Sequence, residues 1–555
     1  MSETRQHPVN RHPVPAGPLD AVIVGAGFAG LYMLHKLRGL GLSALVFEAG
    51  EDVGGTWYWN RYPGARCDVE SMQYSFSFSE ELQQEWQWTE RFSPQPEILR
   101  YANHVADRFD LRRDIRFGTR VTGATFNEAT SRWHVETERG DQVTAAFCIM
   151  ATGCLSAGRV PDIAGIDRFA GKSYHTGQWP HEGVDFTGQR VGVIGTGSSA
   201  IQSIPVIAEQ AAHVFVFQRT PNFSVPARNA ALTPEYEHEW KSSYAERRRR
   251  ARTLKSGIIY DFGETSALAV TPEERQREYA ARWETGGISL LSAYTDLATN
   301  KASNDTAADF VRERIRSIVR DPAVAEMLLP TNHPIGTKRI CVDTDYYETF
   351  NRSNVTLVNL RSTPIEEVTP AGIRTRDAEY AVDSIVYATG FDAMTGAVLK
   401  VDPHGRGGQR LADKWAAGPR TYLGLMTAGF PNLFTITGPG SPSVLSNMIV
   451  SIEQHVEWIA GALAYLRAHG IACMEATAEA EDAWVAHGND VAHQTLYPQA
   501  NSWYMGANIE GKPRVFMPYI GGVGVYRETC DAVAAKGYEG FCLTMGPEMA
   551  SAAAE

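Results

Sequence analysis

Hydrophobic positions in this chain form two similar strand–turn–helix–strand patterns. In residues 19–50 an apolar run ends in glycines, positions with helical spacing follow, and a second apolar run ends at Glu48. Residues 188–220 repeat this pattern. Units with a glycine-rich turn between a strand and a helix are typical of parallel sheets covered by helices. We therefore expect an α/β protein with two Rossmann-like dinucleotide-binding domains.

The remaining pattern predicts a helical insertion followed by further strands. Residues 221–332 contain charged, helix-forming stretches with little strand signal. Strand-like runs return at 354–360, 372–377 and 383–392. Residues 449–470 have the periodicity of an amphipathic helix.

Composition and charge narrow the class of protein. The 555 residues carry a formal net charge of −12, which disfavours binding to nucleic acid or anionic membranes. The arginine run at 247–250 is typical of a solvated helix face, with a nucleic-acid patch as the alternative. Residues 1–19 lack the apolar core of a signal peptide, and no apolar stretch is long enough to span a membrane, so we expect a cytoplasmic protein. The seven cysteines include no CxxC pair, which indicates reduced thiols and no metal site.

The first glycine-rich turn predicts an adenine dinucleotide. Gly25, Gly27 and Gly30 form GxGxxG between the strand and the helix, so the turn, the close approach of a pyrophosphate and the helix packing are all permitted. The helix N-terminus presents N–H groups to the phosphates. Glu48 would accept the ribose hydroxyls, and its charge would repel a 2′-phosphate. This site suits FAD or NAD rather than NADP.

The second turn predicts a different nucleotide. Gly195, Gly197 and Ala200 form the permitted GxGxxA variant. At the end of its second strand the acid is missing and Arg219 is present, followed by Thr220. A guanidinium pairs with a phosphate dianion, so we expect NADP(H) here, with a surface arginine as the simpler alternative.

Two ATG stretches suggest how the domains are divided. Residues 151–153 and 388–390 each follow an apolar run and resemble the crossings between the domains of a two-dinucleotide flavoprotein. The expected order is a flexible tail (1–19), the FAD-binding domain's first part (20–150), the NADP-binding domain's first part (151–220), the helical insertion (221–332), the NADP-binding domain's second part (333–386), the FAD-binding domain's second part (387–544) and a tail (545–555).

Two longer motifs point to a family. Phe169, Gly171, His175, Trp179 and Pro180 fit FxGxxxHxxxWP, and "GGTWYWNRYPGARCD" stands at residues 54–68. Both motifs resemble signatures of type I Baeyer–Villiger monooxygenases. The later segments "GTKR", "ATGFD", "GPGSPSVLSNM" and "SWYMGAN" follow in the family's order, and the chain looks closest to the phenylacetone and steroid monooxygenase branch.

The resemblance implies an FAD- and NADPH-dependent enzyme. It would insert one oxygen atom of O₂ next to a ketone carbonyl through a C4a-peroxyflavin, and would give an ester or lactone from bulky, aryl or cyclic, steroid-like ketones. Arg339 matches the family's catalytic arginine, and Asp68 would pair with it. A guanidinium is always charged, and an arginine buried without a carboxylate is costly.

The same resemblance assigns the binding residues. Those expected to contact FAD are Gly25, Gly27, Ala29, Gly30, Glu48, Thr56, Trp57, Asp68, Tyr74 and Val121. Those expected to contact NADP are Arg66, Cys67, Asp68, Thr196, Gly197, Ser198, Ser199, Ala200, Gln202, Arg219, Thr220, Lys338, Arg339 and Trp503. Those expected to line the substrate pocket are Ser443, Val444, Leu445 and Met448.

The FxGxxxHxxxWP segment lies between the two glycine motifs. The nucleotide domains must shift between reduction of the flavin and the oxygen chemistry, so we interpret His175 as a hydrogen-bonding hinge residue anchored by burial of Trp179. The alternatives are a plain core histidine and an acid–base role.

Other functions remain open at this stage. The chain could be a flavin-containing N- or S-monooxygenase or a non-catalytic FAD/NADPH-binding redox sensor. A disulfide reductase shares the two-domain plan but needs a cysteine pair. We expect a monomer or weak homo-oligomer with a ketone and O₂ as its small-molecule partners.

Overall fold

The computed structural model describes residues 17–546, and its larger sheet contains eight strands. In its strand β1 (Leu19–Val24), Ala21 and Ile23 face one hydrophobic cluster and Val22 and Val24 face another, so residues 21–24 are all apolar because both faces of this strand are buried. In spatial order the strands are β17 (Pro403–His404), β4 (Val121–Asn127), β5 (Arg132–Thr137), β6 (Gln142–Met150), β1 (Leu19–Val24), β2 (Ala44–Phe47) and β3 (Ile115–Arg116), with β18 (Leu433–Thr435) also beside β6.

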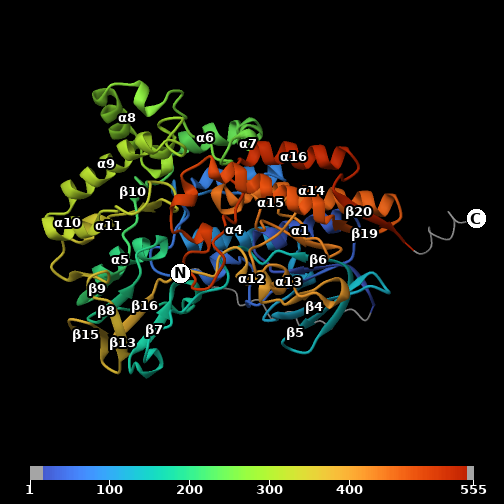
Figure 1. Cartoon of the computed structure of the whole chain (residues 1–555), viewed down its shortest axis with the longest axis horizontal. Helices are drawn as coiled ribbons and strands as arrows, with labels where there is room; N and C mark the ends of the chain where they lie inside the picture. Colours follow the sequence, from blue (N-terminus) through green and yellow to red (C-terminus); the bar gives the residue numbers. More distant parts are fainter. Residues whose placement is uncertain (1–16, 547–555) are drawn as a thin grey trace, which may run out of the picture.

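The second sheet is parallel throughout and lies in the other lobe of the molecule, at the left of Figure 1. In spatial order its strands are β12 (Val355–Asn359), β9 (His213–Gln218), β8 (Arg190–Ile194), β16 (Ser384–Tyr387) and β7 (Lys172–His175). The two parallel sheets, each with a glycine-rich turn and helix, confirm the predicted α/β fold class.

The chain crosses between the two sheets at the ATG stretches. It leaves the larger sheet after β6 and enters the smaller one at β7, and it leaves the smaller sheet after β16 and returns to the larger one at β17. Ala151 and Ala388 stand directly after β6 and β16. The glycine-rich turns and these crossings therefore meet at the carboxyl ends of the parallel strands.

The predicted insertion is mainly helical and lies at the top and the upper left of the molecule in Figure 1. Its helices are α6 (Pro234–Ser242), α7 (Tyr244–Thr253), α8 (Pro272–Thr285), α9 (Lys301–Ile318) and α10 (Pro322–Leu328). It also contributes one strand to a two-stranded parallel sheet, formed by β10 (Ser224–Pro226) and β11 (Cys341–Asp343). The insertion is thus hydrogen-bonded, through β10, to the segment that follows it.

The remaining elements complete the two lobes. The other small sheets consist of β13 (Ile365–Thr369), β14 (Gly372–Thr375) and β15 (Glu379–Ala381), and of β19 (Ile471–Ala476) and β20 (Phe541–Met545). The other helices are α1 (Phe28–Gly39), α2 (Thr56–Trp59), α3 (Glu80–Glu85), α4 (Gln95–Arg108), α5 (Ser198–Gln210), α11 (Tyr346–Thr349), α12 (Gly396–Leu399), α13 (Leu411–Lys414), α14 (Met448–Ala468), α15 (Ala478–His493) and α16 (Val523–Ala535).

Of two predictions about surface character, the first was correct only in part and the second was wrong. The arginine run is not wholly solvated, because Arg248 is buried and donates hydrogen bonds to Gln73, Met72, Ser75 and Gln83. The helix expected to be amphipathic, α14, is buried on most sides because α1, α16 and β19 pack around it.

Polar side chains produced the amphipathic pattern of α14. Glu453, Gln454 and His455 lie inside the protein, where Glu453 accepts hydrogen bonds from Ser77 and His455 accepts one from the Thr437 amide.

The ends of the described chain differ slightly from the expected tails. Leu19 already belongs to β1 and Met545 still belongs to β20, while residues 1–16 and 547–555 of the predicted tails lie outside the described residues. Among the helices of residues 17–546, none has the length and apolar character needed to cross a membrane. The cytoplasmic location and the oligomeric state stay predictions from the sequence.

Candidate functional site

A cavity of about 690 Å³ lies at the carboxyl ends of the larger sheet's central strands. The ends of β1 and β2, the first glycine-rich turn and the 151–158 segment form one wall. Ser198 and Gln202 of α5 reach it from the second lobe, and Val444 and Met448 reach it from the C-terminal part. The crevice beside a topological crossing is where open α/β sheets bind their ligands.

The first turn has the shape that a pyrophosphate requires. Gly25 has φ +106°, and a Cβ there would lie 2.6 Å from the Ala151 carbonyl oxygen. A Cβ at Gly30 would lie 1.9 Å from the Gly25 oxygen, so this glycine allows helix and turn to pack. Gly27 precedes α1 and no side chain caps that helix, which leaves its first N–H groups available to phosphate oxygens.

Glu48 is held rigidly at the end of β2. Its two carboxylate oxygens accept hydrogen bonds of 2.7 Å from the amides of Ala26 and Gly50. Burial raises the pKa of Glu48, and these two hydrogen bonds oppose the rise. Because Glu48 also lines the cavity, its oxygens fit a ribose diol beside the turn.

The second turn repeats this construction in the other lobe. Gly195 has φ +116°, and a Cβ there would lie 2.4 Å from the Ala388 oxygen. A Cβ at Gly197 would meet no atom within 4 Å, and no side chain caps α5 after it. Thr196 donates a hydrogen bond of 2.8 Å to the Thr220 carbonyl, which ties this turn to the segment after β9. Both turns therefore fit a dinucleotide.

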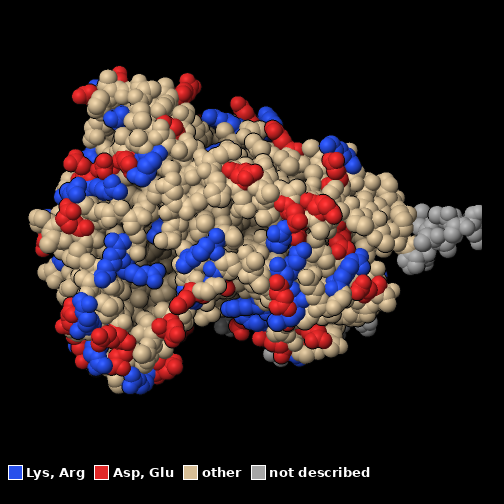
Figure 2. Space-filling model, in the orientation of Figure 1, with Lys and Arg blue, Asp and Glu red and all other residues tan. Residues whose placement is uncertain are grey.

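Three cations gather beside the second turn. Arg219 follows β9, and its charge and that of Arg361 act on Lys338. Burial lowers the pKa of Lys338, and the two guanidinium charges lower it further. Figure 2 shows positive side chains gathered over the region where Figure 1 labels α5 and β9. Arg361 was missed in the sequence, where the only signal is a basic residue soon after a strand.

Arg339 and Asp68 meet in the cavity although 271 positions separate them. The guanidinium Nε and Nη2 each donate a hydrogen bond of 2.7 Å to one carboxylate oxygen, which gives a bidentate pair. Burial lowers the pKa of Arg339, but the charge and hydrogen bonds of Asp68 more than offset it, so the pKa lies well above its usual value. Arg339 therefore presents a permanent positive charge to the cavity.

The third nitrogen of this guanidinium holds the loop expected to contact substrate. Arg339 Nη1 donates a hydrogen bond of 2.6 Å to the Val444 carbonyl. The loop is fixed at its other end by Asn447. Its side-chain amide donates a hydrogen bond to the Gln73 carbonyl and its backbone amide donates one to the Ser256 carbonyl, at 2.8 Å in both cases. Gln73 also binds the backbone of Ile259 in the helical insertion. Neither Gln73 nor Ser256 was singled out from the sequence.

The predicted substrate residues differ in their placement. Val444 and Met448 line the cavity. Ser443 is fully buried behind it and donates to the Thr437 carbonyl, and Leu445 packs against a neighbouring hydrophobic cluster.

The FxGxxxHxxxWP segment touches the cavity through its middle. Gly177 and Gln178 line the wall, whereas His175 lies behind it. The His175 ring accepts a hydrogen bond from the Gly177 amide at Nδ1 and lies 3.2 Å from the Arg159 carbonyl at Nε2. Burial lowers the pKa of His175, which favours the neutral ring. Trp179 is buried, as its proposed anchoring role requires.

Just over half of the predicted site residues line this cavity. The predicted residues that line it are Gly25, Gly27, Ala29, Glu48, Thr56, Trp57, Arg66, Cys67, Asp68, Tyr74, Val121, Ser198, Gln202, Arg339, Val444, Met448 and Trp503. Those outside its lining are Gly30, Thr196, Gly197, Ser199, Ala200, Arg219, Thr220, Lys338, Ser443, Leu445, Phe169, Gly171, His175, Trp179 and Pro180. Within residues 17–546, no group of three His, Cys, Asp or Glu side chains is arranged to hold a metal.

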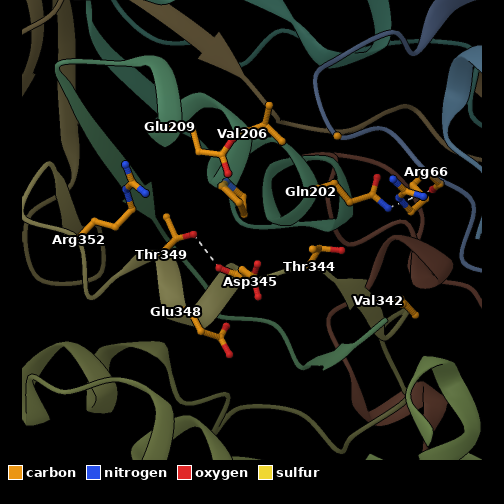
Figure 3. Close-up of a pocket in the computed structure, with 12 residues that line it drawn as sticks. Arg66, Gln202, Val206, Glu209, Val342, Thr344, Asp345, Glu348, Thr349 and Arg352 are labelled. Carbon is orange, nitrogen blue, oxygen red and sulfur yellow. Dashed lines mark hydrogen bonds between the residues drawn. The ribbon is translucent and has the colours of Figure 1, made fainter. Parts of the chain in front are cut away.

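A second hollow, of about 330 Å³, shares Arg66 and Gln202 with the main cavity. Figure 3 shows Glu209, Asp345 and Glu348 around it. These carboxylates disfavour a phosphate, so this hollow is a poor site for a nucleotide.

Two dinucleotide-binding turns and one paired guanidinium around a shared cavity define a two-nucleotide flavoprotein oxidoreductase. Residues 22–259 match the family model for pyridine nucleotide-disulphide oxidoreductase, although all seven cysteines are free. A Baeyer-Villiger monooxygenase of Pseudooceanicola batsensis is 45% identical over 94% of this chain and 95% of its own length.

Solved structures agree with this relative. An oxidized steroid monooxygenase bound to NADP is 56% identical with a TM-score of 0.92, covering 96% of this chain and 100% of its own. OTEMO in complex with FAD and NADP is 43% identical with a TM-score of 0.92 and the same coverage. The chain belongs to the Baeyer–Villiger monooxygenases, which use FAD and NADPH to insert one oxygen atom of O₂ next to a ketone carbonyl.

Proposed function

We propose that this monooxygenase acts on bulky, aryl-bearing or cyclic, steroid-like ketones, and that Arg339 is its catalytic residue. The observation that carries the proposal is the Asp68–Arg339–Val444 contact, which joins a permanent cation to the substrate loop inside the cavity. This contact supports one location for both charge stabilisation and substrate positioning.

Arg339 would stabilise negative charge that develops on oxygen. A guanidinium has five N–H donors. Asp68 takes two of them and the Val444 carbonyl takes a third, which leaves two for the substrate oxygen and its attacking partner. Because arginine stays charged, it donates hydrogen bonds without releasing a proton that would quench a nucleophile. Asp68 is a positioning residue that fixes the guanidinium.

The two turns would divide the cofactors between the lobes. FAD, held at Gly25, Gly27 and Glu48, would carry electrons from NADPH to O₂ and supply the oxygen that is transferred. NADPH would lie at Gly195 and Gly197. The two crossings at the ATG stretches would then be the domain boundaries, and the segment around His175 would be the hinge that connects them.

The substrate class follows from the apolar end of the cavity. Val444, Met448 and Ile452 contribute aliphatic side chains there, which suits a hydrocarbon-rich ketone. The steroid monooxygenase at 56% identity supports a large substrate for this chain.

The test is a panel of ketones of increasing size. FAD-loaded enzyme with NADPH should convert phenylacetone and a steroid methyl ketone to esters with a higher kcat/KM than acetone. Arg339→Ala should retain FAD and lose ester formation. Faster turnover of acetone than of both larger ketones would refute the substrate class, and unchanged ester formation in Arg339→Ala would remove Arg339 from the mechanism.

A further inference from the structure

A second guanidinium, that of Arg361, stands beside Arg219, the residue predicted to select NADP. β9 and β12 are parallel neighbours, with Gln218 opposite Asn359 in register, so the chain leaves both strands at the same edge of the sheet. The Leu360 amide donates to the Gln218 carbonyl at 2.8 Å, which continues this pairing by one residue. Arg219 directly follows Gln218, and Arg361 directly follows Leu360.

Arg361 is held over the backbone of Arg219. Its Nε donates a hydrogen bond of 3.0 Å to the Arg219 carbonyl, and its amide donates one of 3.1 Å to the Asn359 side chain. Because Nε is occupied, the two terminal nitrogens remain for a ligand. The turn after β12 thus places a fork of N–H donors next to the Arg219 backbone.

The charges around this point are strongly unbalanced. In the part of the chain that the structure describes, Arg219, Lys338 and Arg361 form no ion pair with a carboxylate, and both arginines are exposed. Burial, followed by the charges of Lys338, Arg312 and Arg361, lowers the pKa of His333 to about 3. The His333 Nε2 is buried without a hydrogen-bond partner. Three clustered cations without a counter-charge repel one another, so an anion bound among them would be stabilised by all three.

The cluster lies within reach of the second dinucleotide turn. Thr196 of the GxGxxA motif donates to the carbonyl of Thr220, the residue after Arg219. In a Rossmann-like unit the end of the second strand meets the adenosine ribose, and a basic residue there accommodates a 2′-phosphate.

We propose that Arg361 is a specificity-determining residue that binds the 2′-phosphate of NADP(H) together with Arg219 and Lys338. The proposal rests on the assignment of NADPH to the second turn. Arg361 acts as a forked donor to the phosphate and also fixes the Arg219 backbone.

The experiment measures binding rather than turnover. NADP⁺, NAD⁺ and adenosine 2′,5′-bisphosphate are titrated calorimetrically into the FAD-loaded protein and its Arg361→Ala, Arg361→Lys and Arg219→Ala variants. We expect Arg361→Ala to raise the Kd of NADP⁺ and of the bisphosphate about five- to tenfold, because one charge-assisted, solvent-exposed contact is lost, and to leave the Kd of NAD⁺ unchanged. Arg361→Lys should retain part of the affinity, since it keeps the charge but not the fork.

The matched control is Arg352→Ala. Arg352 is an exposed arginine at the opposite end of β12, so its removal changes the net charge equally without touching the cluster. It should leave all three Kd values unchanged, and thermal melting should show that each variant is folded.

The outcomes separate the inference from the site assignment. If Arg219→Ala weakens NADP⁺ selectively but Arg361→Ala does not, Arg361 has no part in phosphate recognition. If Arg361→Ala weakens NADP⁺ and NAD⁺ equally, its role is structural and the proposal is overturned. If neither variant affects NADP⁺, the 2′-phosphate is bound elsewhere and the cofactor assignment of the second turn fails as well.

Discussion

Replacing Asp68 by asparagine should strongly reduce oxygen transfer to the ketone, while the protein retains its FAD. The substitution keeps the size of the side chain but removes its charge and one acceptor. The side chains of Arg339 and Asp68 are 31% and 22% exposed. Breaking a fully buried ion pair costs ~3–5 kcal/mol and breaking an exposed one at most ~1 kcal/mol, so this pair should contribute ~2–3 kcal/mol.

Losing this energy should cause a measurable fall in the rate of ester formation. Since each 1.4 kcal/mol is a factor of ten, kcat/KM for ester formation should fall by about 30- to 150-fold if the whole contribution is lost in the transition state. The assay follows ester by gas chromatography together with NADPH consumption and hydrogen peroxide. We expect NADPH oxidation to continue and peroxide to replace ester, because the guanidinium is no longer fixed beside the substrate.

Asp383→Asn is the matched control. Asp383 forms a similar bidentate pair with Arg190, but the two side chains are 44% and 47% exposed and stand at the start of the second sheet. Its ester yield should equal that of the wild type. If FAD-saturated Asp68→Asn also forms ester within about threefold of the wild-type rate, the positioning role of Asp68 is refuted.

Two further changes test the fold around the site. Gly25→Ala should destabilise the protein by ~2–4 kcal/mol and weaken FAD retention, because the φ of Gly25 is +106° and the new Cβ would lie 2.6 Å from the Ala151 oxygen. The control is Gly488→Ala in α15, where the new Cβ would meet no atom within 4 Å, and this variant should be slightly more stable than the wild type. Equal melting temperatures would contradict this. Burial raises the pKa of Asp343 from 3.8 to about 7, so its contribution to stability is present below pH 4 and is lost as the pH rises through 7. The free energy of unfolding of Asp343→Asn, measured with urea, should therefore rise by up to ~4 kcal/mol relative to that of the wild type between pH 4 and pH 8. A difference between the two proteins that does not change with pH would show that Asp343 does not titrate in this range.

Local patterns predicted the dinucleotide folds well because their causes are local. The turns at Gly25 and Gly195 need glycine for their backbone angles, and the apolar strands before them are buried on both faces. The burial of Arg248 was not predictable, since its partners come from a distant segment of the chain. A charged helix can therefore be predicted to face solvent and still bury one of its arginines.

The Asp68–Arg339 pair and the cation cluster illustrate the same limit at the site. Nothing in the spacing of Asp68 and Arg339 places them together, and only the family resemblance suggested it. Arg361 lies beside Arg219 because β12 pairs with β9. The order of strands in a parallel sheet cannot be predicted from the sequence of either strand alone. Contacts between distant segments are thus the part of the site that the structure adds.

The most direct test of the account is the fate of oxygen. FAD-loaded protein is incubated with NADPH, phenylacetone and ¹⁸O₂, and the products are analysed by mass spectrometry. We expect benzyl acetate with one ¹⁸O atom, one NADPH consumed for each ester formed, and the second oxygen atom released as water. Consumption of NADPH with all of the O₂ recovered as hydrogen peroxide, and phenylacetone unchanged, would contradict it.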